Sequence, residues 1–324
     1  MPSLADSFNR SISYMRISVT DRCNLRCFYC TTKLTAHLTH SDILSYEEIR
    51  KVVQAASELG INHIRLTGGE PLVRPDVSAL VRLLSEVEGV EEVSMTSNGI
   101  LLEKQARELK SAGLKRINIS LDTFKPQKFQ EICGFDKLES VLAGIEAAKR
   151  VGLEPVKINT VVIRGYNDDE ILDFARKSLE GWHVRFIEYM PIGEGDTDKG
   201  SMSPQEIRKI IEENVAPLEA GHLLAGNGPA RYFRLPGASG SIGFIGALSE
   251  HFCETCNRIR LTADGHLRPC LLSDEEIDLK TPLRNGADLE EIKQLIRETV
   301  ARKKDGHHLE EAALPRKQMW QIGG

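Results

Sequence analysis

The stretch Cys23-Asn24-Leu25-Arg26-Cys27-Phe28-Tyr29-Cys30 contains three cysteines with the spacing C-x3-C-x2-C. Three thiolates from one short loop can bind three irons of a cubane iron–sulfur cluster and leave the fourth iron without a protein ligand. The stretch follows residues 15–19, a predicted strand, and loops at the carboxyl ends of barrel strands carry catalytic groups. The alternatives are a zinc knuckle or a redox pair, but no fourth cysteine is near and a redox pair would not need Cys23. We therefore expect an open, catalytic cluster here.

A second group of cysteines lies far downstream, at Cys253, Cys256 and Cys270, with the spacing C-x2-C-x13-C. It too has three members where a closed metal site needs four. A zinc ribbon is the alternative, because C-x2-C on a turn is common there and His251 or His266 could supply a fourth ligand. The spacing alone leaves both interpretations open.

Composition narrows the class of protein. The chain has 324 residues, 41% hydrophobic and 27% charged, with a net charge of −5. This size allows one large domain with an appendage, or two domains. No apolar run approaches the roughly 20 residues that span a bilayer, and the N-terminus has no basic region followed by an apolar one. The seven cysteines are odd in number and six of them are grouped, which favours metal ligation in a reducing cytoplasm over a disulfide framework. Mild acidity argues against a nucleic-acid partner.

Strand and helix patterns alternate through the first 190 residues. Capping residues support the assignments, with a capping box at Ser45-Tyr46-Glu47-Glu48 and a helix cap expected at Asn167. We expect helices at 46–59, 76–87, 101–112, 138–151 and 168–179, and strands at 15–19, 63–66, 93–96, 116–121, 156–163 and 184–188. Six βα-type units in order imply parallel strands joined by right-handed crossovers, and eight would close a full barrel. The sequence thus predicts an α/β fold with a partial (βα)6 barrel.

The regular alternation of strand and helix patterns ends after residue 191. A Gly- and Asp-rich linker covers 193–200, and Ser203-Pro204-Gln205-Glu206 opens another helix. Short strands are expected at 230–235, 241–245, 258–262 and 266–268, with a hairpin turn at Asp264-Gly265 and a final helix at 289–303. We divide the chain into a barrel domain, residues 1–192, and a C-terminal region, residues 193–324.

The first cysteine loop, with its aromatic Tyr29, resembles the signature of the radical S-adenosylmethionine superfamily. The loop Gly68-Gly69-Glu70-Pro71 resembles the second motif of that superfamily, which binds the amino group of the methionine moiety. Alone, a Gly-Gly pair is more often a simple turn. Its place after the second strand, downstream of the cysteine loop, makes the resemblance specific.

Further stretches resemble one family within that superfamily, the GTP 3′,8-cyclases of molybdenum cofactor biosynthesis. The matching stretches are 20–27, 65–71, 96–99, 186–191, 253–260 and the closing Gly323-Gly324. The resemblance spans nearly the whole chain. It implies a partial barrel followed by a C-terminal region that holds a second 4Fe-4S cluster.

The resemblance also implies the reaction and its partners. Two 4Fe-4S clusters and S-adenosylmethionine are the expected cofactors. One electron cleaves S-adenosylmethionine to a 5′-deoxyadenosyl radical, which abstracts hydrogen from C3′ of GTP. The ribosyl radical attacks C8, giving (8S)-3′,8-cyclo-7,8-dihydroguanosine 5′-triphosphate. The implied partners are an electron donor and cyclic pyranopterin monophosphate synthase, which takes the product, and a homodimer is the family expectation.

Individual roles follow from the same resemblance. It assigns the first cluster to Cys23, Cys27 and Cys30, and the second, whose open iron binds guanine, to Cys253, Cys256 and Cys270. The residues that it implies for S-adenosylmethionine binding are Tyr29, Gly69, Ser120 and Met190. A Met beside a strand end, however, is usually a packing residue. The residues that it implies for GTP binding are Arg16, Arg65, Thr96, Lys157, Arg258, Ile259 and Arg260.

Residue chemistry agrees with part of this assignment. Arg258 and Arg260 alternate on a strand and so face one side, and guanidinium groups suit bidentate phosphate contacts, although such pairs are more often solvated. Gly323 and Gly324 would ordinarily be a frayed end, but in the family this tail reaches the active site and supports radical formation. Glycines can thread a crowded space with unusual backbone angles.

Two other functions remain as alternatives. One is a peptide-modifying radical enzyme with an auxiliary cluster, which would usually carry more C-terminal cysteines. The other is a non-enzymatic zinc-ribbon binding module. Two further features are expected to have no functional role. Cys133 has no clustered partner and is expected to be a small buried or half-buried residue, and His307-His308 is expected to be solvated in a polar segment.

Overall fold

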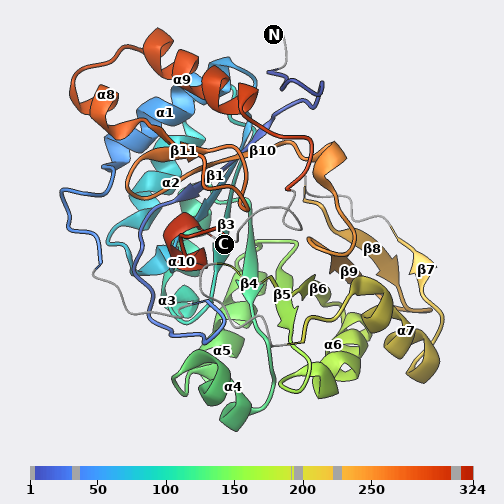
Figure 1. Ribbon diagram of the computed structural model, residues 1–324. Helices are drawn as coiled ribbons and strands as arrows, with labels where there is room; N and C mark the ends of the chain where they lie inside the picture. The colour runs from blue at the N-terminus through green and yellow to red at the C-terminus, as the bar shows by residue number, and fades with distance from the viewer. Residues whose placement is uncertain are drawn as a thin grey trace.

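The computed structural model describes residues 4–30, 37–190, 192, 200–221, 228–307 and 315–323. The six strands predicted in the first half are present, each within two residues of its expected bounds. They are β1 (Tyr14–Ser18), β2 (His63–Thr67), β3 (Glu92–Ser97), β4 (Arg116–Ser120), β5 (Lys157–Val162) and β6 (His183–Glu188). Each strand pairs in parallel with the next, which confirms the predicted parallel sheet (Figure 1).

Helices connect these strands on the outer side of the curved sheet (Figure 1). They are α1 (Tyr46–Glu58), α2 (Val77–Ser85), α3 (Leu102–Ser111), α4 (Pro126–Cys133), α5 (Leu138–Arg150) and α6 (Ile171–Lys177). The predicted capping box of α1 is confirmed: Ser45 Oγ accepts from the Glu48 amide at 3.1 Å, and the Glu48 carboxylate accepts from the Ser45 amide at 2.7 Å. Of these six helices, only α4 was not predicted; Lys125 at its N-cap makes no side-chain capping bond, and its only end signals are Pro126 and Gly134.

The predicted cap at Asn167 is wrong. The Asn167 amide accepts a hydrogen bond from Ile163 N–H and donates to the carbonyls of Asp122 and Val161, each at 2.8 Å. A short 3-10 turn, Asp168–Glu170, then leads into α6. An asparagine side chain can satisfy backbone groups outside a helix, and here it joins the ends of two strands instead of capping.

The C-terminal region adds strands to both sides of the same sheet. β10 (Arg258–Leu261) pairs in parallel with β1, and β9 (Ser241–Ile245) pairs in parallel with β6. Eight neighbouring strands therefore run parallel, in the order β10-β1-β2-β3-β4-β5-β6-β9. The six-stranded partial barrel is thus extended by two strands whose pairing the sequence did not indicate.

Antiparallel strands complete each side. β11 (His266–Arg268) and β12 (Ile277–Asp278) follow β10, and β8 (Arg231–Arg234) and β7 (Glu219–Ala220) follow β9. The predicted hairpin turn between β10 and β11 is confirmed, with Gly265 at φ +81°. Within the described residues the strand order runs from β12 to β7, so the sheet stays open between β9 and β10.

Four helices belong to the C-terminal region: α7 (Pro204–Asn214), α8 (Lys280–Arg284), α9 (Leu289–Ala301) and α10 (Met319–Ile322). α9 packs against α1, where Lys293 Nζ lies 2.7 Å from a Glu58 carboxylate oxygen. One hydrophobic core and one sheet contain residues from both sides of the expected boundary at residue 192. None of the described helices is long and apolar enough to cross a membrane.

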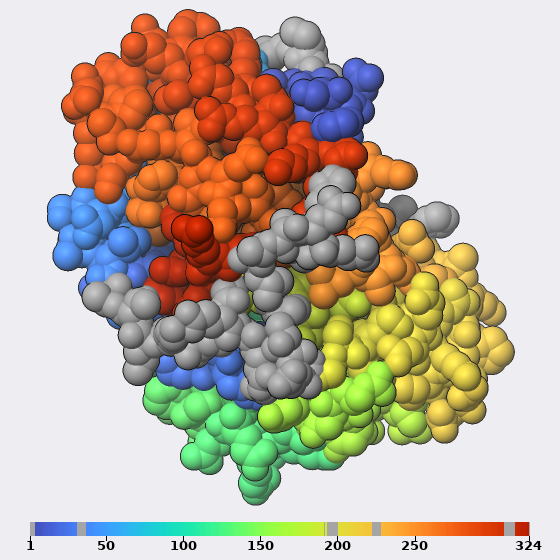
Figure 2. Space-filling model, in the orientation of Figure 1, coloured from blue at the N-terminus to red at the C-terminus, as the bar shows by residue number. Residues whose placement is uncertain are grey.

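The C-terminal segment, drawn red, lies at the centre of the molecule (Figure 1). Figure 2 shows it on one face, between the orange C-terminal region above and blue and green barrel segments below. A second hydrophobic cluster holds it there, formed by Ile192, Leu272 and Ile322. The side chain of Ile322 is only 1% exposed, so the tail packs into the protein.

Candidate active site

Both cysteine groups line one cavity of about 350 Å³, which we call the central cavity. We call Cys23, Cys27 and Cys30 the first triad, and Cys253, Cys256 and Cys270 the second triad. The parallel strands β10, β1, β2, β3, β4, β5 and β6 also contribute to the cavity wall, through Arg258, Arg16, Arg65, Thr96, Ser120, Lys157 and Arg185 respectively. Two groups separated by more than 200 residues in sequence thus face the same space.

The first triad has the donor chemistry of a cluster site. Its three thiols are free and half-buried, and the Cys30 amide donates to the Cys27 carbonyl at 2.9 Å, which closes the turn. In the described part of the chain, no three His, Cys, Asp or Glu side chains are spaced to hold a single metal ion. Sulfurs on one zinc lie roughly 4 Å apart, whereas thiolates that bind separate irons of a cubane need not converge so closely. The triad therefore fits a cluster better than a zinc knuckle.

The second triad is assembled as predicted across a hairpin. Cys253 and Cys256 lie on one 3-10 turn, where the Cys256 amide donates to the Cys253 carbonyl at 3.1 Å. Cys270 follows β11 and returns to the same turn. Burial, together with the nearby thiols of Cys270 and Cys256, raises the pKa of Cys253. The three free thiols are thus close enough to influence one another, as ligands of one cluster must be.

The loop after β2 packs directly on the first cysteine loop. The Gly69 amide donates to the Thr20 carbonyl at 2.8 Å, and a Cβ at Gly69 would lie 2.4 Å from the Arg22 carbonyl oxygen. Only glycine allows this approach. The buried Glu70 carboxylate accepts from the Asn98 amide at 2.6 Å and from Ser97 Oγ at 2.8 Å, and burial raises its pKa to about 7. Glu70 therefore joins the loops that follow β2 and β3.

The residues assigned to S-adenosylmethionine, Tyr29, Gly69, Ser120 and Met190, all line the central cavity. The Tyr29 hydroxyl donates to Asp122 Oδ2 at 2.5 Å, and burial raises the pKa of Asp122 to about 6. Met190 packs against the hydrophobic cluster that contains Ile322 of the tail. The structure brings these residues together, and their individual roles stay predictions.

Most residues assigned to GTP also line the cavity. Arg260, Arg16 and Arg65 are direct neighbours in register on β10, β1 and β2, so their side chains share one face of the sheet. Arg258, Thr96 and Lys157 lie on the same wall. Ile259 is the exception: its side chain is fully buried in the hydrophobic core on the opposite face of β10, because strand residues alternate.

The cationic wall is electrostatically unfavourable when empty. Burial and the nearby charges of Arg65, Arg258 and Arg185 lower the pKa of Arg16 to about 10. Burial and the charges of Arg185, Arg116 and Arg65 lower the pKa of Lys157 to about 6. Crowded buried cations destabilise one another, and a polyanion bound among them relieves that repulsion. The wall is therefore suited to a triphosphate.

Sequence reasoning missed Arg185. Its side chain is buried in the cavity wall, and no described residue forms a hydrogen bond with its Nε or Nη2 atoms. Unsatisfied buried donors are rare, and on the wall of a cavity such donors are available to a bound anion. The signal that could have found it is a single arginine between the apolar Val184 and Phe186 of a central strand.

The tail reaches the cationic wall. The Gly323 carbonyl accepts a hydrogen bond from the Arg260 guanidinium, and Gly323 has φ +73°. A Cβ at Gly323 would lie 2.7 Å from Thr67 Cγ2 and 3.1 Å from Ser18 Cβ. Glycine is therefore required here both by conformation and by space. Gly324 lies outside the described residues.

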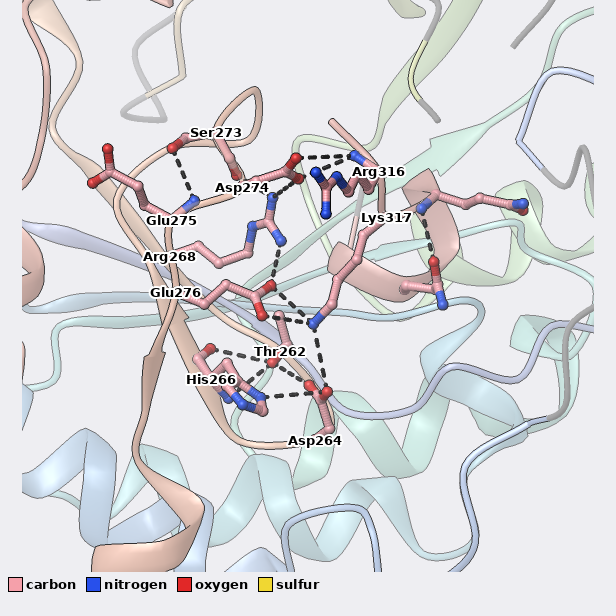
Figure 3. A network of polar contacts seen from close by, with 12 residues as sticks. Thr262, Asp264, His266, Arg268, Ser273, Asp274, Glu275, Glu276, Arg316 and Lys317 are labelled. Carbon is pink, nitrogen blue, oxygen red and sulfur yellow. Dashed lines mark hydrogen bonds and ion pairs between the residues drawn. The ribbon is translucent and has the colours of Figure 1, made fainter. Parts of the chain in front are cut away.

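Ion pairs and a hydrogen bond hold Arg316 and Lys317, the residues just before the tail helix α10, against the C-terminal region (Figure 3). Lys317 Nζ lies 2.8 Å from a Glu276 carboxylate oxygen and 3.5 Å from Asp264 Oδ2. The Arg316 amide donates to Asp274 Oδ1 at 3.0 Å. These contacts connect the tail to β11 and to the loop after Cys270.

Two residues that were expected to have no functional role lie close to the triads. Cys133 is buried, as expected, and it lines the central cavity near Cys27, because α4 packs against the first cysteine loop. His307 also lines the cavity, and its Nε2 lies 2.8 Å from His251 Nδ1. The chain turns back across the second triad after α9, which brings His307 inward, whereas His308 lies outside the described residues.

Comparisons with known proteins agree with this site. The family model described as "Radical SAM superfamily" matches residues 17–177, and "Molybdenum Cofactor Synthesis C" matches residues 182–309. The crystal structure of Streptococcus suis SuiB bound to S-adenosylmethionine is similar in fold, with a TM-score of 0.63 and 14% identity, covering 95% of this chain and 76% of that one. This likeness supports the barrel and its C-terminal extension, and at such identity it supports the fold alone.

Sequence relatives are much more similar. The GTP 3′,8-cyclase of Moorella thermoacetica is 51% identical over 323 residues, covering 99% of this chain and all of that protein. The GTP 3′,8-cyclase of Pelotomaculum thermopropionicum is 49% identical over 325 residues, with the same coverage. With both triads on one cavity, the full-length likeness leaves neither alternative function standing. The chain belongs to the GTP 3′,8-cyclase family of the radical S-adenosylmethionine superfamily.

Proposed function

We propose that the central cavity converts GTP to (8S)-3′,8-cyclo-7,8-dihydroguanosine 5′-triphosphate in molybdenum cofactor biosynthesis, with a 4Fe-4S cluster on each triad. The observation that carries this proposal is the shared cavity: both triads and a row of buried arginines line it. A radical formed beside the first triad would meet a nucleotide held beside the second without crossing solvent.

Cys23, Cys27 and Cys30 would hold a 4Fe-4S cluster, and this cluster with S-adenosylmethionine would supply a 5′-deoxyadenosyl radical by one-electron cleavage of the sulfonium. The chain's own residues bind and shield that cofactor. Gly69 allows the loop after β2 to approach the first cysteine loop closely. Tyr29 lines the same cavity, and its hydroxyl is held by the hydrogen bond to Asp122. Met319 and Trp320 of the packed tail line the cavity, and their apolar side chains help to exclude water that could quench a radical.

The cationic wall would hold the substrate. Arg16, Arg65 and Arg260 lie side by side in register, and Arg185 has unsatisfied donors for a further phosphate oxygen. Guanidinium groups suit phosphate through paired hydrogen bonds. Fixing the triphosphate orients the ribose toward the radical, and such positioning can contribute about 7–11 kcal/mol.

The second triad would place its cluster where it can bind the guanine base. Its thiols open into the same cavity as Arg258, two residues beyond Cys256. Arg260, on that same strand, also binds the Gly323 carbonyl, so the tail and the substrate side of the cavity share one guanidinium. This contact supports a functional role for the tail at Gly323, and the same role for Gly324 stays a prediction.

Partners beyond GTP follow from the chemistry. Radical formation consumes one electron, so an electron donor is required. The cyclised nucleotide would pass to cyclic pyranopterin monophosphate synthase. These partners, a cytoplasmic location and a homodimer remain predictions.

The test is anaerobic reconstitution followed by turnover with GTP, S-adenosylmethionine and a reductant. We expect about eight irons per chain, because each triad should hold a four-iron cluster. We also expect 5′-deoxyadenosine and the cyclised nucleotide in GTP-dependent amounts, with ATP as the control nucleotide. Full iron loading with no GTP-dependent product would contradict the proposed substrate, and about four irons would contradict the second cluster.

A further inference from the structure

Lys303 is a buried lysine in contact with the second triad. It follows α9 and is only 3% exposed. Its Nζ donates to Cys256 Sγ at 3.4 Å and to the Pro269 carbonyl, next to Cys270, at 3.0 Å. One ammonium group thus contacts one cysteine of the triad and the backbone adjoining another.

The surroundings of this lysine are unusual because buried charges are normally paired with opposite charges. Among the described residues, no carboxylate forms an ion pair with Lys303. The group that its ammonium contacts and that becomes negatively charged on binding a metal is therefore the thiol of Cys256. A lysine buried in this way is costly to the fold unless its charge is used there.

Cys253, the third cysteine of the second triad, is connected to the same chain segment, residues 303–305, through Arg10. The Arg10 guanidinium donates to the Cys253 carbonyl at 2.8 Å and to the Asp305 carbonyl at 3.0 Å. Residues 303–305 therefore contact the loops of all three cysteines, through Lys303 on one side and through Arg10 on the other. Such a segment can hold the triad in a fixed geometry before a cluster binds.

We propose that Lys303 is a positioning residue for the second cluster, which holds Cys256 and the Cys270 loop together and raises the cluster's midpoint potential. The inference rests on the proposed function, because it requires a cluster on the second triad. A hydrogen bond from a cation to a ligand sulfur stabilises the more negative, reduced state of an iron–sulfur cluster. The second cluster should therefore accept an electron more readily than it would without Lys303.

The first triad differs at Cys23. Among the described residues, Cys23 Sγ accepts from the neutral Leu25 amide at 3.4 Å, and the nearby Arg26 guanidinium donates to the Cys23 carbonyl, not to the sulfur. The buried acids Glu70 and Asp122 also lie near this triad. Lys303 would therefore act on one cluster and not on the other. This selectivity gives the experiment an internal reference.

The test is a redox titration of the fully loaded protein, followed by EPR spectroscopy, on the wild type and on Lys303→Met, Lys303→Arg and Lys304→Met. Lys304 is the matched control, because it is the adjacent lysine but is 62% exposed. We expect Lys303→Met to lower the midpoint potential of the second cluster only, Lys303→Arg to recover most of the change, and Lys304→Met to leave both potentials unchanged.

Iron content separates the possible failures. If the wild type holds about four irons, the proposed second cluster fails, whatever Lys303 does. If it holds about eight and Lys303→Met changes neither potential, the inference is overturned; a raised KM for GTP with both potentials unchanged would likewise assign Lys303 to the substrate. If Lys303→Met loses four irons, retention by Lys303→Arg supports the inference, and equal loss in both variants overturns it.

Discussion

The two triads share one cavity, but Cys23 of the first and Cys256 of the second lie in opposite electrostatic surroundings. Burial raises the pKa of Cys23 to about 12, and Glu70 adds to the rise. Burial would also raise the pKa of Cys256, but Arg258 and Lys303 outweigh it and bring that pKa down to about 7. The protein therefore resists negative charge at Cys23 and favours it at Cys256, whereas burial raises the pKa of Cys253 in the second triad too.

This difference agrees with the two proposed tasks. A cluster that must give an electron to a sulfonium is helped by surroundings that disfavour its reduced, more negative state. A cluster beside a triphosphate needs cations that serve both the ligand and the cluster. The following predictions test the contrast, from the largest expected effect to the smallest.

Loss of one ligand from each triad should separate the tasks most strongly. Cys27→Ser should abolish 5′-deoxyadenosine formation, because no S-adenosylmethionine can be cleaved without the first cluster. Cys256→Ser should keep slow cleavage while the cyclised nucleotide falls by more than about 100-fold, the upper range for loss of a supporting group at a metal site. Iron analysis should give about four irons in each variant. Equal loss of both products in both variants would show that the triads do not have separate tasks.

The tail glycine should have the next largest effect. Gly323→Ala places a methyl group 2.7 Å from Thr67 Cγ2 at φ +73°, so the tail must shift. A displacement of about 1 Å can cost about 100-fold in rate, measured as kcat with both clusters loaded.

A matched control is Gly286→Ala. Gly286 has φ +91°, but a Cβ there meets nothing within 4 Å. It should cost about 1–2 kcal/mol of folding stability from backbone strain alone and leave kcat unchanged. Similar kcat values for the two variants would exclude a specific role for the tail.

Arg185 tests the cationic wall. Arg185→Gln removes unsatisfied buried donors and should raise the Kd for GTP by about 10- to 100-fold, since hydrogen bonds to charged groups contribute about 1.5–3 kcal/mol. The affinity for S-adenosylmethionine should not change. Arg176→Gln on the exposed face of α6 is the control, with no expected effect on either ligand. An unchanged Kd for GTP in Arg185→Gln would remove Arg185 from the substrate site.

Proton uptake on GTP binding should be the smallest effect. With its pKa lowered to about 6, Lys157 is mostly neutral in the empty site at pH 7.5, and a bound triphosphate favours the protonated form. GTP affinity should therefore fall as pH rises above 6. Calorimetry in buffers of different ionisation enthalpy should detect uptake of about one proton, lost in Lys157→Met but kept in Lys209→Met, an exposed control. Uptake that persists in Lys157→Met would assign it to another group.

The sequence predicted the fold where local signals are strong. The six strands, the capping box of α1 and the hairpin turn before His266 follow from period, cap and turn chemistry. The parallel pairing of β9 and β10 with the barrel could not be foreseen, because strand pairing between distant segments leaves no local trace. The Asn167 cap failed for a related reason: its side chain has a choice of backbone partners that only the tertiary structure decides.

In the site, too, residues with a local sequence signal were predicted and residues defined only by their neighbours in space were not. Cysteine spacing identified both triads, and all described residues assigned to S-adenosylmethionine line the cavity. Arg185, Cys133, His307 and Lys303 were missed because single residues without spacing gain meaning only from their neighbours. Ile259 was included with the arginines beside it, although strand alternation turns its side chain into the core.

The most direct test of the central claim is hydrogen transfer from GTP deuterated at C3′. The central claim is that a radical formed beside the first triad acts on a nucleotide held beside the second, within one cavity. Mass spectrometry of 5′-deoxyadenosine from the fully loaded protein should show one deuterium in each molecule formed during GTP turnover. Unlabelled 5′-deoxyadenosine, formed at the same rate with or without GTP, would contradict the account.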